Sequence, residues 1–286
     1  MTITITTSNV NGIRAAKRKG IEQWAAKNTP DVWCMQEVRA PQNEIDPIFD
    51  EFGFEYATAG RIADQSGLDR MNEICRIKGR AGVGLLSALP VIDKRYGLPG
   101  LAEDVDSGRW IEADVKTPQG YTVTVVCVYV HAGNTDDPEK MKQKYRFLDT
   151  MLVRMGQLRD EAAHGGRQAV LCGDFNIAHT PLDIKNAKAN EKHAGFLPEE
   201  RAYVDKWLGE LEFVDVMRSL CGDIQGPYTW WSQRGRAFDN NVGWRIDYQF
   251  ATPELAETAR GYVTDKAPTY DLRWSDHAPL SITYDV

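Results

Sequence analysis

The chain of 286 residues lacks several features that would place it in other classes of protein. No apolar run approaches the length of a membrane-spanning helix, and the alternating N-terminus has no basic start of the kind that secretory signals carry. We therefore expect a cytoplasmic protein with no membrane partner. The sequence also has no GxSxG, Walker, GxGxxG or HExxH motif, which removes the usual signs of a serine hydrolase, a nucleotide-binding loop or a zinc protease.

Cysteine is scarce, and its five residues are scattered without a CxxC pair. This spacing is typical of reduced thiols in a core rather than of a disulfide framework or a zinc site. Basic residues are outnumbered, since the net charge is −7, which argues against a protein that coats nucleic acid non-specifically. The charge does not exclude a nuclease, because clustered carboxylates hold metals while a local basic face binds phosphates.

Short apolar runs alternate with amphipathic segments along the chain. The clearest helix is predicted from Asp137 to about His164, because Asp137 can cap it, Pro138 fits its first position, and two glycines follow. Its apolar stripe is Leu148, Met151, Leu152, Met155 and Leu158. Other helices are predicted over residues 20–27 and, weakly, 47–52. Strands are predicted over residues 2–9, 32–36, 83–87, 111–115, 121–130, 169–174, 246–250 and 280–284.

Many strands with intervening helices, and no linker, favour a single α/β domain over residues 1–286. Alternating strands at both ends suit two stacked sheets with helices outside. A barrel and an open parallel sheet remain alternatives on pattern alone. The polar segment 60–80, with charges of both signs, is expected to form a surface loop.

A Gly-Asp-Phe-Asn motif follows directly on a buried run at residues 173–176. Residues two apart in an extended segment point to the same side, so Asp174 and Asn176 can converge on one water or one phosphate. An Asx turn after a strand explains this motif, taken alone, about equally well.

Polar side chains also close two earlier strands. Glu37 follows the run 32–36, where a carboxylate suits Mg²⁺, although a glutamate at a strand end is more often simply solvated. Asn9 and Asn11 end the first strand and precede a basic run that begins at Arg14. That run is either a solvated helix face or a phosphate contact.

His277, next to Asp276, is a weak signal alone, but a second acid, Asp247, offers a carboxylate to orient the ring. Such a carboxylate would raise the pKa of the imidazole, so that a charged ring grips a phosphate oxygen. Carboxylates, amides, one histidine and several basic residues together suit metal-assisted attack of water on a phosphodiester.

These motifs, in this order, resemble the endonuclease/exonuclease/phosphatase superfamily and, within it, the exonuclease III and AP endonuclease family. The resemblance runs from Asn9 to His277, nearly the whole chain. It implies a two-layer β-sandwich flanked by helices, which is a four-layer α/β/β/α fold.

The resemblance also implies a Mg²⁺ or Mn²⁺ site whose principal ligand is Glu37. The implied ligand set is Asn11, Glu37, Asp174, Asn176, Asp276 and His277. Asp174 would position or deprotonate the attacking water, and Asn176 would contact the scissile phosphate. His277, oriented by Asp247, would bind a phosphate oxygen and stabilise charge in the transition state. Tyr129 matches a family tyrosine near the phosphate.

Residues 228–231 and 241–247 resemble the recognition loops of AP endonucleases. Trp230, Trp244 and Ile246 match the apolar residues that receive a flipped, baseless sugar, whose extrusion costs little because it has no base to unstack. A core position is the alternative for these tryptophans, above all for Trp231. The other residues that the resemblance places at DNA are Asn9, which would also orient the metal-site carboxylates, Arg14, Lys185, Asn186, Asn190 and Arg245.

The sequence departs from the family pattern in three places. His131 stands in a segment where a proline is common, segment 60–80 is longer than expected, and Ser8 stands where a tryptophan is common. The packing next to Asn9 is therefore expected to differ from that of the family.

We expect a metal-dependent AP endonuclease with 3′→5′ exonuclease or 3′-end processing activity, which cuts the DNA phosphodiester 5′ to abasic sites in base-excision repair. Its partner would be double-stranded DNA with abasic sites or 3′ ends, and the chain would be a monomer. One alternative is a superfamily enzyme for phosphoinositides, sphingomyelin or undamaged DNA, against which Trp230, Trp244 and the 185–190 segment argue. The other is an inactive DNA-binding module, against which the competent residue types at every catalytic position argue.

Overall fold

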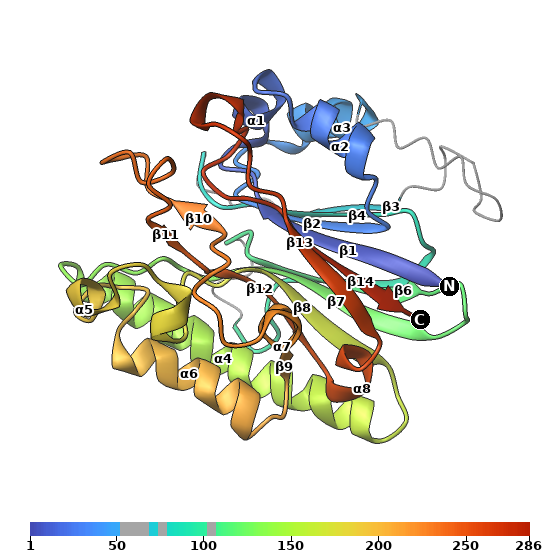
Figure 1. The fold of residues 1–286 in the computed structure, drawn as a ribbon. Helices are drawn as coiled ribbons and strands as arrows, with labels where there is room; N and C mark the ends of the chain where they lie inside the picture. The colour runs from blue at the N-terminus through green and yellow to red at the C-terminus, as the bar shows by residue number, and fades with distance from the viewer. Residues whose placement is uncertain (52–68, 74–78, 102–106) are drawn as a thin grey trace.

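Two six-stranded β-sheets lie face to face in this computed structural model, which describes residues 1–51, 69–73, 79–101 and 107–286 (Figure 1). Helices cover the outer face of each sheet, so that the layers run helix, sheet, sheet, helix. The structure therefore confirms the predicted helix-flanked β-sandwich and rules out the barrel and the open parallel sheet.

The strand order of each sheet is continuous from edge to edge. The first sheet contains, in spatial order, β13 (Ala259–Thr264), β14 (Leu280–Asp285), β1 (Thr2–Asn9), β2 (Val32–Gln36), β4 (Val83–Ser87) and β3 (Asp69–Glu73). The second contains β5 (Val91–Tyr96), β6 (Trp110–Lys116), β7 (Thr122–Tyr129), β8 (Gln168–Asp174), β12 (Asp247–Ala251) and β9 (Val214–Asp215). A separate ribbon pairs β10 (Trp230–Trp231) with β11 (Gly243–Trp244).

Helices α1 (Ile13–Arg18), α2 (Ile21–Asn28) and α3 (Gln42–Glu51) lie over the first sheet, and α4 (Pro138–Ala163) and α6 (Pro198–Gly209) lie over the second (Figure 1). The connections carry α5 (Ala187–Asn190), α7 (Val216–Cys221), α8 (Pro253–Ala256) and the 3₁₀ turns η3 (Pro181–Asp183) and η4 (Tyr270–Leu272). Within the described ranges no helix is long and apolar enough to cross a membrane.

Helix α4 has the boundaries that its sequence predicted. The Asp137 carboxylate accepts the backbone N–H of Lys140, Pro138 occupies the first turn, and Gly165 follows the C-cap. Leu148 and Met151, which belong to the predicted apolar stripe, are buried and pack against the outer face of the second sheet. Propensity, capping and burial agree along this helix, which is why its sequence identified it.

Each central strand contributes to two cores, because successive residues point to opposite faces. On β7, Val123 and Val125 face the space between the sheets, whereas Val126 and Val128 face α4. The space between the sheets also holds free, buried thiols, as expected for reduced core cysteines; those described there are Cys34, Cys127 and Cys172. Cys75 lies outside the described residues.

Two sequence predictions need correction. The weak helix predicted over residues 47–52 begins at Gln42 and contains Pro47, because Ile45 and Ile48 bury against the α1–α2 core and fix the earlier turn. The segment 60–80 is not simply a loop, since β3 within it pairs with β4 along the edge of the first sheet. Edge strands of polar composition lack the apolar alternation that identifies strands in a sequence. The rest of the segment up to residue 78 lies outside the described residues.

The topology brings several strand ends to one edge. β1 runs parallel to β2, and β7 runs parallel to β8, so the carboxyl ends of each pair coincide. β12 is antiparallel to β8 and begins where β8 ends, with Asp247 paired to Asp174. The polar residues that follow these strands therefore lie together.

A buried group of ion pairs lies between β6 and α4, toward the β5 edge of the second sheet. Arg154 donates to both oxygens of Glu112 at 2.8 Å each, and Arg95 donates to Glu112 at 2.8 Å. Both acids on β6 that it involves, Glu112 and Asp114, are fully buried. These pairs join the helix layer to the sheet and take no part in the strand-end cluster described above.

Ser8 explains how the chain accommodates the absence of a tryptophan at that position. The indole N–H of Trp33 donates to the Ser8 hydroxyl at 2.7 Å, and both residues are fully buried. We predict that Ser8→Ala lowers the free energy of unfolding by about 1–3 kcal/mol, because it removes the hydroxyl that accepts the buried indole N–H. Urea unfolding measures this loss.

Trp33→Phe provides the matched control, because it removes the donor. In that background the added Ser8→Ala change should cost less than about 0.5 kcal/mol. An equal cost of Ser8→Ala in both backgrounds would show that the hydrogen bond contributes nothing.

Candidate active site

The carboxamide of Asn9 links the two sheets at the shared edge. Its Nδ2 donates to Glu37 Oε1 and to Asp174 Oδ2, at 2.9 Å each. Its own backbone oxygen accepts the Ser275 hydroxyl at 2.6 Å. Three distant parts of the sequence therefore meet around one fully buried side chain.

Glu37 stands at a turn just beyond β2, with a left-handed backbone at φ 54°. Its Oε1 also accepts the Tyr129 hydroxyl at 2.8 Å, and its Oε2 pairs with Arg39. Arg39 in turn donates to Asn11 Oδ1 at 2.8 Å. Asn11 Nδ2 donates to Asp276 Oδ1 at 2.7 Å, so these side chains form one connected polar group.

Asp174 is fixed by the turn that follows β8. Its Oδ1 accepts the backbone N–H of Asn176 at 2.9 Å, and the Asn176 carboxamide donates to its Oδ2 at 3.3 Å and to Val130 O at 3.0 Å. The Asx turn considered from the sequence is therefore present. It holds the carboxylate in the cluster, so the structural and functional explanations of this motif are compatible.

Asp247, distant in sequence, is the carboxylate that orients His277. Its Oδ2 lies 2.9 Å from Nδ1 of the ring, whereas Nε2 lies 3.8 Å from Asp174 Oδ2. Thr229 accepts the backbone N–H groups of Ile246 and Asp247 at 3.1 Å each, which fixes the start of β12. Asp174, Asp247 and His277 each offer a ligand atom within 4.8 Å of the others.

The buried charges shift one another's ionisation. Burial raises the pKa of Asp174, as does the charge of Asp247, and it reaches about 7 despite the opposing charge of His277. Burial alone would lower the pKa of His277, but the charge and hydrogen bond of Asp247 raise it to about 9. Burial and the charge of Asp174 raise the pKa of Tyr129 to about 12, so the phenol stays a neutral donor.

The donor set fits a hard divalent cation. Glu37, Asn11 and Asp276 present carboxylate and amide oxygens, which Mg²⁺ and Mn²⁺ accept. Asp247 Oδ1 is buried without a hydrogen-bond partner in the described structure. Among the described residues, the carboxylates of this cluster outnumber the cations paired with them, Arg39 and His277, so a divalent ion would offset a local excess of negative charge.

An ion pair under the site supports its loops. Lys144 Nζ lies 2.6 Å from Glu200 Oε1 and donates to Asn176 O at 2.9 Å and Ala132 O at 3.1 Å. Glu200 Oε2 accepts the N–H of Gly195 at 2.6 Å. Both charged groups are fully buried, so each needs the other. The pair joins the loops that follow β7 and β8.

A group of apolar side chains lies beside this cluster, and we call it the pocket wall after the pocket for a baseless sugar that the resemblance implies. Ile246 is buried, and Trp230 and Trp244 pack against it half-exposed, with ring centroids 6.0 Å apart. The Trp230 ring lies 6.4 Å from the His277 ring, and its N–H donates to Asp276 Oδ2 at 3.2 Å. Trp231 is instead buried with Phe238, as the core alternative expected for it.

Two of the other positions expected at DNA, Asn9 and Arg245, are fully buried, and most of the rest are exposed. Arg14 is exposed and pairs with Glu44, and Lys185 and Asn186 are exposed. Asn190 donates to Asn186 O at 3.0 Å within the same loop. His131 packs edge-on against Phe147.

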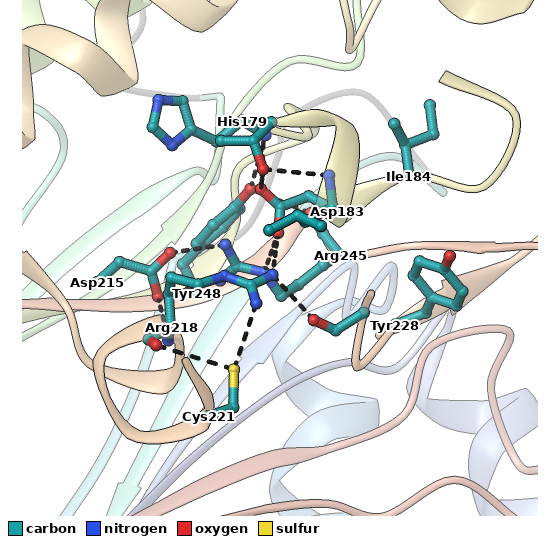
Figure 2. A network of polar contacts seen from close by, with 12 residues as sticks. His179, Asp183, Ile184, Asp215, Arg218, Cys221, Tyr228, Arg245 and Tyr248 are labelled. Carbon is teal, nitrogen blue, oxygen red and sulfur yellow. Dashed lines mark hydrogen bonds and ion pairs between the residues drawn. The ribbon is translucent and has the colours of Figure 1, made fainter. Parts of the chain in front are cut away.

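Arg245 does not lie at the DNA-facing surface that the resemblance implied for it. The guanidinium is fully buried, with Nε 2.7 Å from Asp183 Oδ1 and Nη2 2.7 Å from Asp215 Oδ2 (Figure 2). It is therefore out of reach of a DNA phosphate. A single arginine between two pocket residues carries no sign in the sequence of which way its side chain points.

Two arginines of the site escaped the sequence analysis. Arg39 follows Glu37 by only two residues, and a cation so close to a carboxylate in the sequence offered a usable signal. Arg109 lies over the Tyr129 ring at 4.7 Å and donates to Tyr129 O at 3.2 Å. Nothing near Arg109 in the sequence indicates this contact, which arises from strand pairing.

The chain is similar to known proteins over nearly its whole length. A model of the Endonuclease/Exonuclease/phosphatase family matches residues 6–277. An exodeoxyribonuclease of Bacillus subtilis is 29% identical over 279 residues, which cover 97% of this chain and 98% of that protein.

Solved structures agree with this match. An AP endonuclease from Archaeoglobus fulgidus is similar with a TM-score of 0.81 and 30% identity, over 99% of this chain and 100% of that one. A 3′ phosphatase from Neisseria, bound to a product DNA hairpin, gives a TM-score of 0.81 and 26% identity, also over 99% and 100%.

The ionisation of His277 provides a direct test of the pair with Asp247. In the metal-free protein, NMR titration of the ring should report a pKa of about 9, and Asp247→Asn should lower that pKa, because burial is then opposed only by the charges of Asp174 and Asp276. Since the folded-state pKa is raised, the pair stabilises the fold below pH 6.5, and this contribution is lost as the pH rises through about 9. An unchanged titration in Asp247→Asn would contradict the assignment.

Proposed function

The chain belongs to the endonuclease/exonuclease/phosphatase family, and from that premise we propose that it is a metal-dependent AP endonuclease that cuts DNA 5′ to abasic sites and also processes 3′ ends. The observation that carries the proposal is the contact of an apolar pocket wall with a phosphodiesterase-type cluster. Trp230 touches both, since it packs near Trp244 and donates to Asp276.

The pocket accounts for selection of the lesion. A baseless sugar has lost its stacking, so its extrusion from the duplex costs little. Trp230, Trp244 and Ile246 offer it an apolar surface within ring contact of His277. The exposed Lys185 and Asn186 supply polar contacts for the DNA backbone on the adjoining loop.

Glu37, Asn11 and Asp276 would hold the Mg²⁺ or Mn²⁺ ion, which would stabilise negative charge on the phosphate. Asp174 accepts the proton of the attacking water, a task for which a pKa of about 7 suits it. His277, held through Nδ1 by Asp247, directs Nε2–H to a phosphate oxygen. As the water oxygen bonds to phosphorus, the bond to the 3′ oxygen breaks, and the 3′ oxygen takes a proton from solvent water, so that the upstream strand leaves with a 3′-hydroxyl.

Asn176 and Tyr129 complete the arrangement around the phosphate. The Asn176 carboxamide orients Asp174, and its longer hydrogen bond, 3.3 Å, is the one that a phosphate oxygen would replace. Tyr129 stays protonated, and its hydroxyl donates to Glu37 Oε1. His277 in its protonated form serves the phosphate, because a protonated ring has no lone pair for an ion.

The proposed activity is tested with a duplex that contains one abasic analogue. We predict one incision 5′ to the analogue, abolished by EDTA and restored by Mg²⁺ or Mn²⁺, because the carboxylate cluster needs the ion. An otherwise identical intact duplex is the control, and phosphoinositide and sphingomyelin substrates cover the alternative enzymes. Folded protein that binds the abasic duplex without cutting it would support the inactive DNA-binding module instead.

The residue roles are tested by two substitutions. Asp174→Asn and His277→Ala should each lower kcat by about 10²–10⁴-fold, because one removes the proton acceptor and the other a charged phosphate contact. His164→Ala, at the exposed C-cap of α4, is the matched control and should cut normally. Near-normal turnover of either site variant would reject its assigned role.

A further inference from the structure

A buried ionic network lies behind the pocket wall. It consists of Asp183, Asp215, Arg218 and Arg245, which we call the anchor network (Figure 2). Its members come from η3, from the N-cap and first turn of α7, and from the segment just before β12. The cluster at the strand ends does not include them.

Arg245 connects the two acids. Its Nε lies 2.7 Å from Asp183 Oδ1, its Nη1 donates to Asp215 Oδ1 at 3.0 Å, and its backbone N–H donates to Asp183 O at 2.7 Å. Its guanidinium also lies 4.5 Å from the centre of the Tyr248 ring. Side chain and main chain therefore both fix Arg245 to the η3 turn.

Asp183 fixes that turn internally as well. Its Oδ2 accepts the N–H and the hydroxyl of Thr180 at 2.8 and 2.9 Å, and its Oδ1 accepts Arg218 at 2.5 Å. The arginine charges hold the pKa of Asp183 at about 2 despite burial, which would raise it. The carboxylate thus stays ionised, and loss of either arginine leaves a buried charge with one partner fewer.

Arg218 extends the network to the following loop. Its guanidinium donates to the carbonyl oxygens of Gly222, Ile224 and Gly226 at 2.7–2.9 Å. Gly226 N–H then donates to Leu182 O at 2.7 Å. The loop between α7 and β10 is therefore closed against the η3 turn.

The neighbours of Arg245 form the pocket wall. Successive residues of an extended chain point to opposite sides, so the inward direction of Arg245 leaves Trp244 and Ile246 on the other side, where both belong to the pocket wall. Trp244 forms a β-bridge with Ile184, and Lys185 N–H donates to Gly243 O at 2.9 Å. The anchor network thus holds the exposed loop at 185–190 against the pocket wall.

We infer that Asp183 and Arg245 are positioning residues that set the pocket wall and the 185–190 loop in register, and that this register determines selection of an abasic nucleotide. The inference rests on the proposed function. Neither residue touches the DNA. Their effect passes through Trp244, Ile246 and Lys185, which are held in place by the contacts above.

The test compares wild type, Arg245→Met and Arg154→Met in steady-state incision of the abasic-analogue duplex with Mg²⁺. Arg154→Met breaks the buried pair with Glu112 at the far side of the second sheet and matches the loss of a buried arginine. Arg245→Met should raise KM at least about tenfold and change kcat less, because a misplaced binding surface weakens substrate positioning. Arg154→Met should leave KM unchanged.

Hydrogen exchange gives a second readout that needs no activity. The amides of residues 182–190 should exchange at least about tenfold faster in Arg245→Met, and those of β7 and β8 should be unchanged. In wild type, local opening of this loop has to break the contacts of Arg245, and without them its free energy of opening is lower. Asp183→Asn keeps the shape of the side chain and should show the same direction if Arg245→Met fails to fold.

The outcomes separate the two claims. Equal KM rises in Arg245→Met and Arg154→Met, or unchanged exchange at 182–190, would overturn the positioning role while the incision by wild type stands. A wild type that does not cut the abasic duplex would overturn the proposed function and the selection of abasic DNA with it. The exchange measurement would still decide whether the network holds the loop.

Discussion

The carboxamide of Asn9 is the interaction on which the site depends, because it joins the two sheets where their strands end. One nitrogen donates to Glu37, which follows a strand of the first sheet, and to Asp174, which ends a strand of the second. These acids would repel each other if nothing lay between them. The amide separates them and fixes their distance, so that the metal side and the water-activating side of the site form one unit.

Buried charges recur wherever a loop near the site must be held. The Lys144–Glu200 pair lies under the loops after β7 and β8, and the Asp183–Arg245 contact lies behind the pocket wall. Buried ion pairs contribute little net stability over apolar packing, but breaking one partner away is costly, so they favour one arrangement over others. We interpret both pairs as contacts that hold the neighbouring loops in one geometry.

The central strands and helix α4 were readable from the sequence because local signals agreed with burial. β2 and β4 have the predicted bounds, and α4 begins and ends at its predicted capping residues. β3 was missed because an edge strand needs no apolar alternation, and α3 was placed too late because its burial depends on tertiary contacts. For the site, motif order indicated the strand-end carboxylates, whereas side-chain direction decided Arg245 and strand pairing decided Arg109, neither of which a linear pattern contains.

In the proposed mechanism, lesion selection and phosphodiester hydrolysis take place at one edge of the fold. A crystal structure of Asp174→Asn with Mg²⁺ and a duplex containing an abasic analogue tests this union most directly. We predict that the baseless sugar lies against Trp230 and Trp244, that its 5′ phosphate lies within hydrogen-bond distance of His277, and that the ion lies at Glu37. A duplex seated on another face, or a sugar that remains stacked in the helix away from the tryptophans, would contradict it.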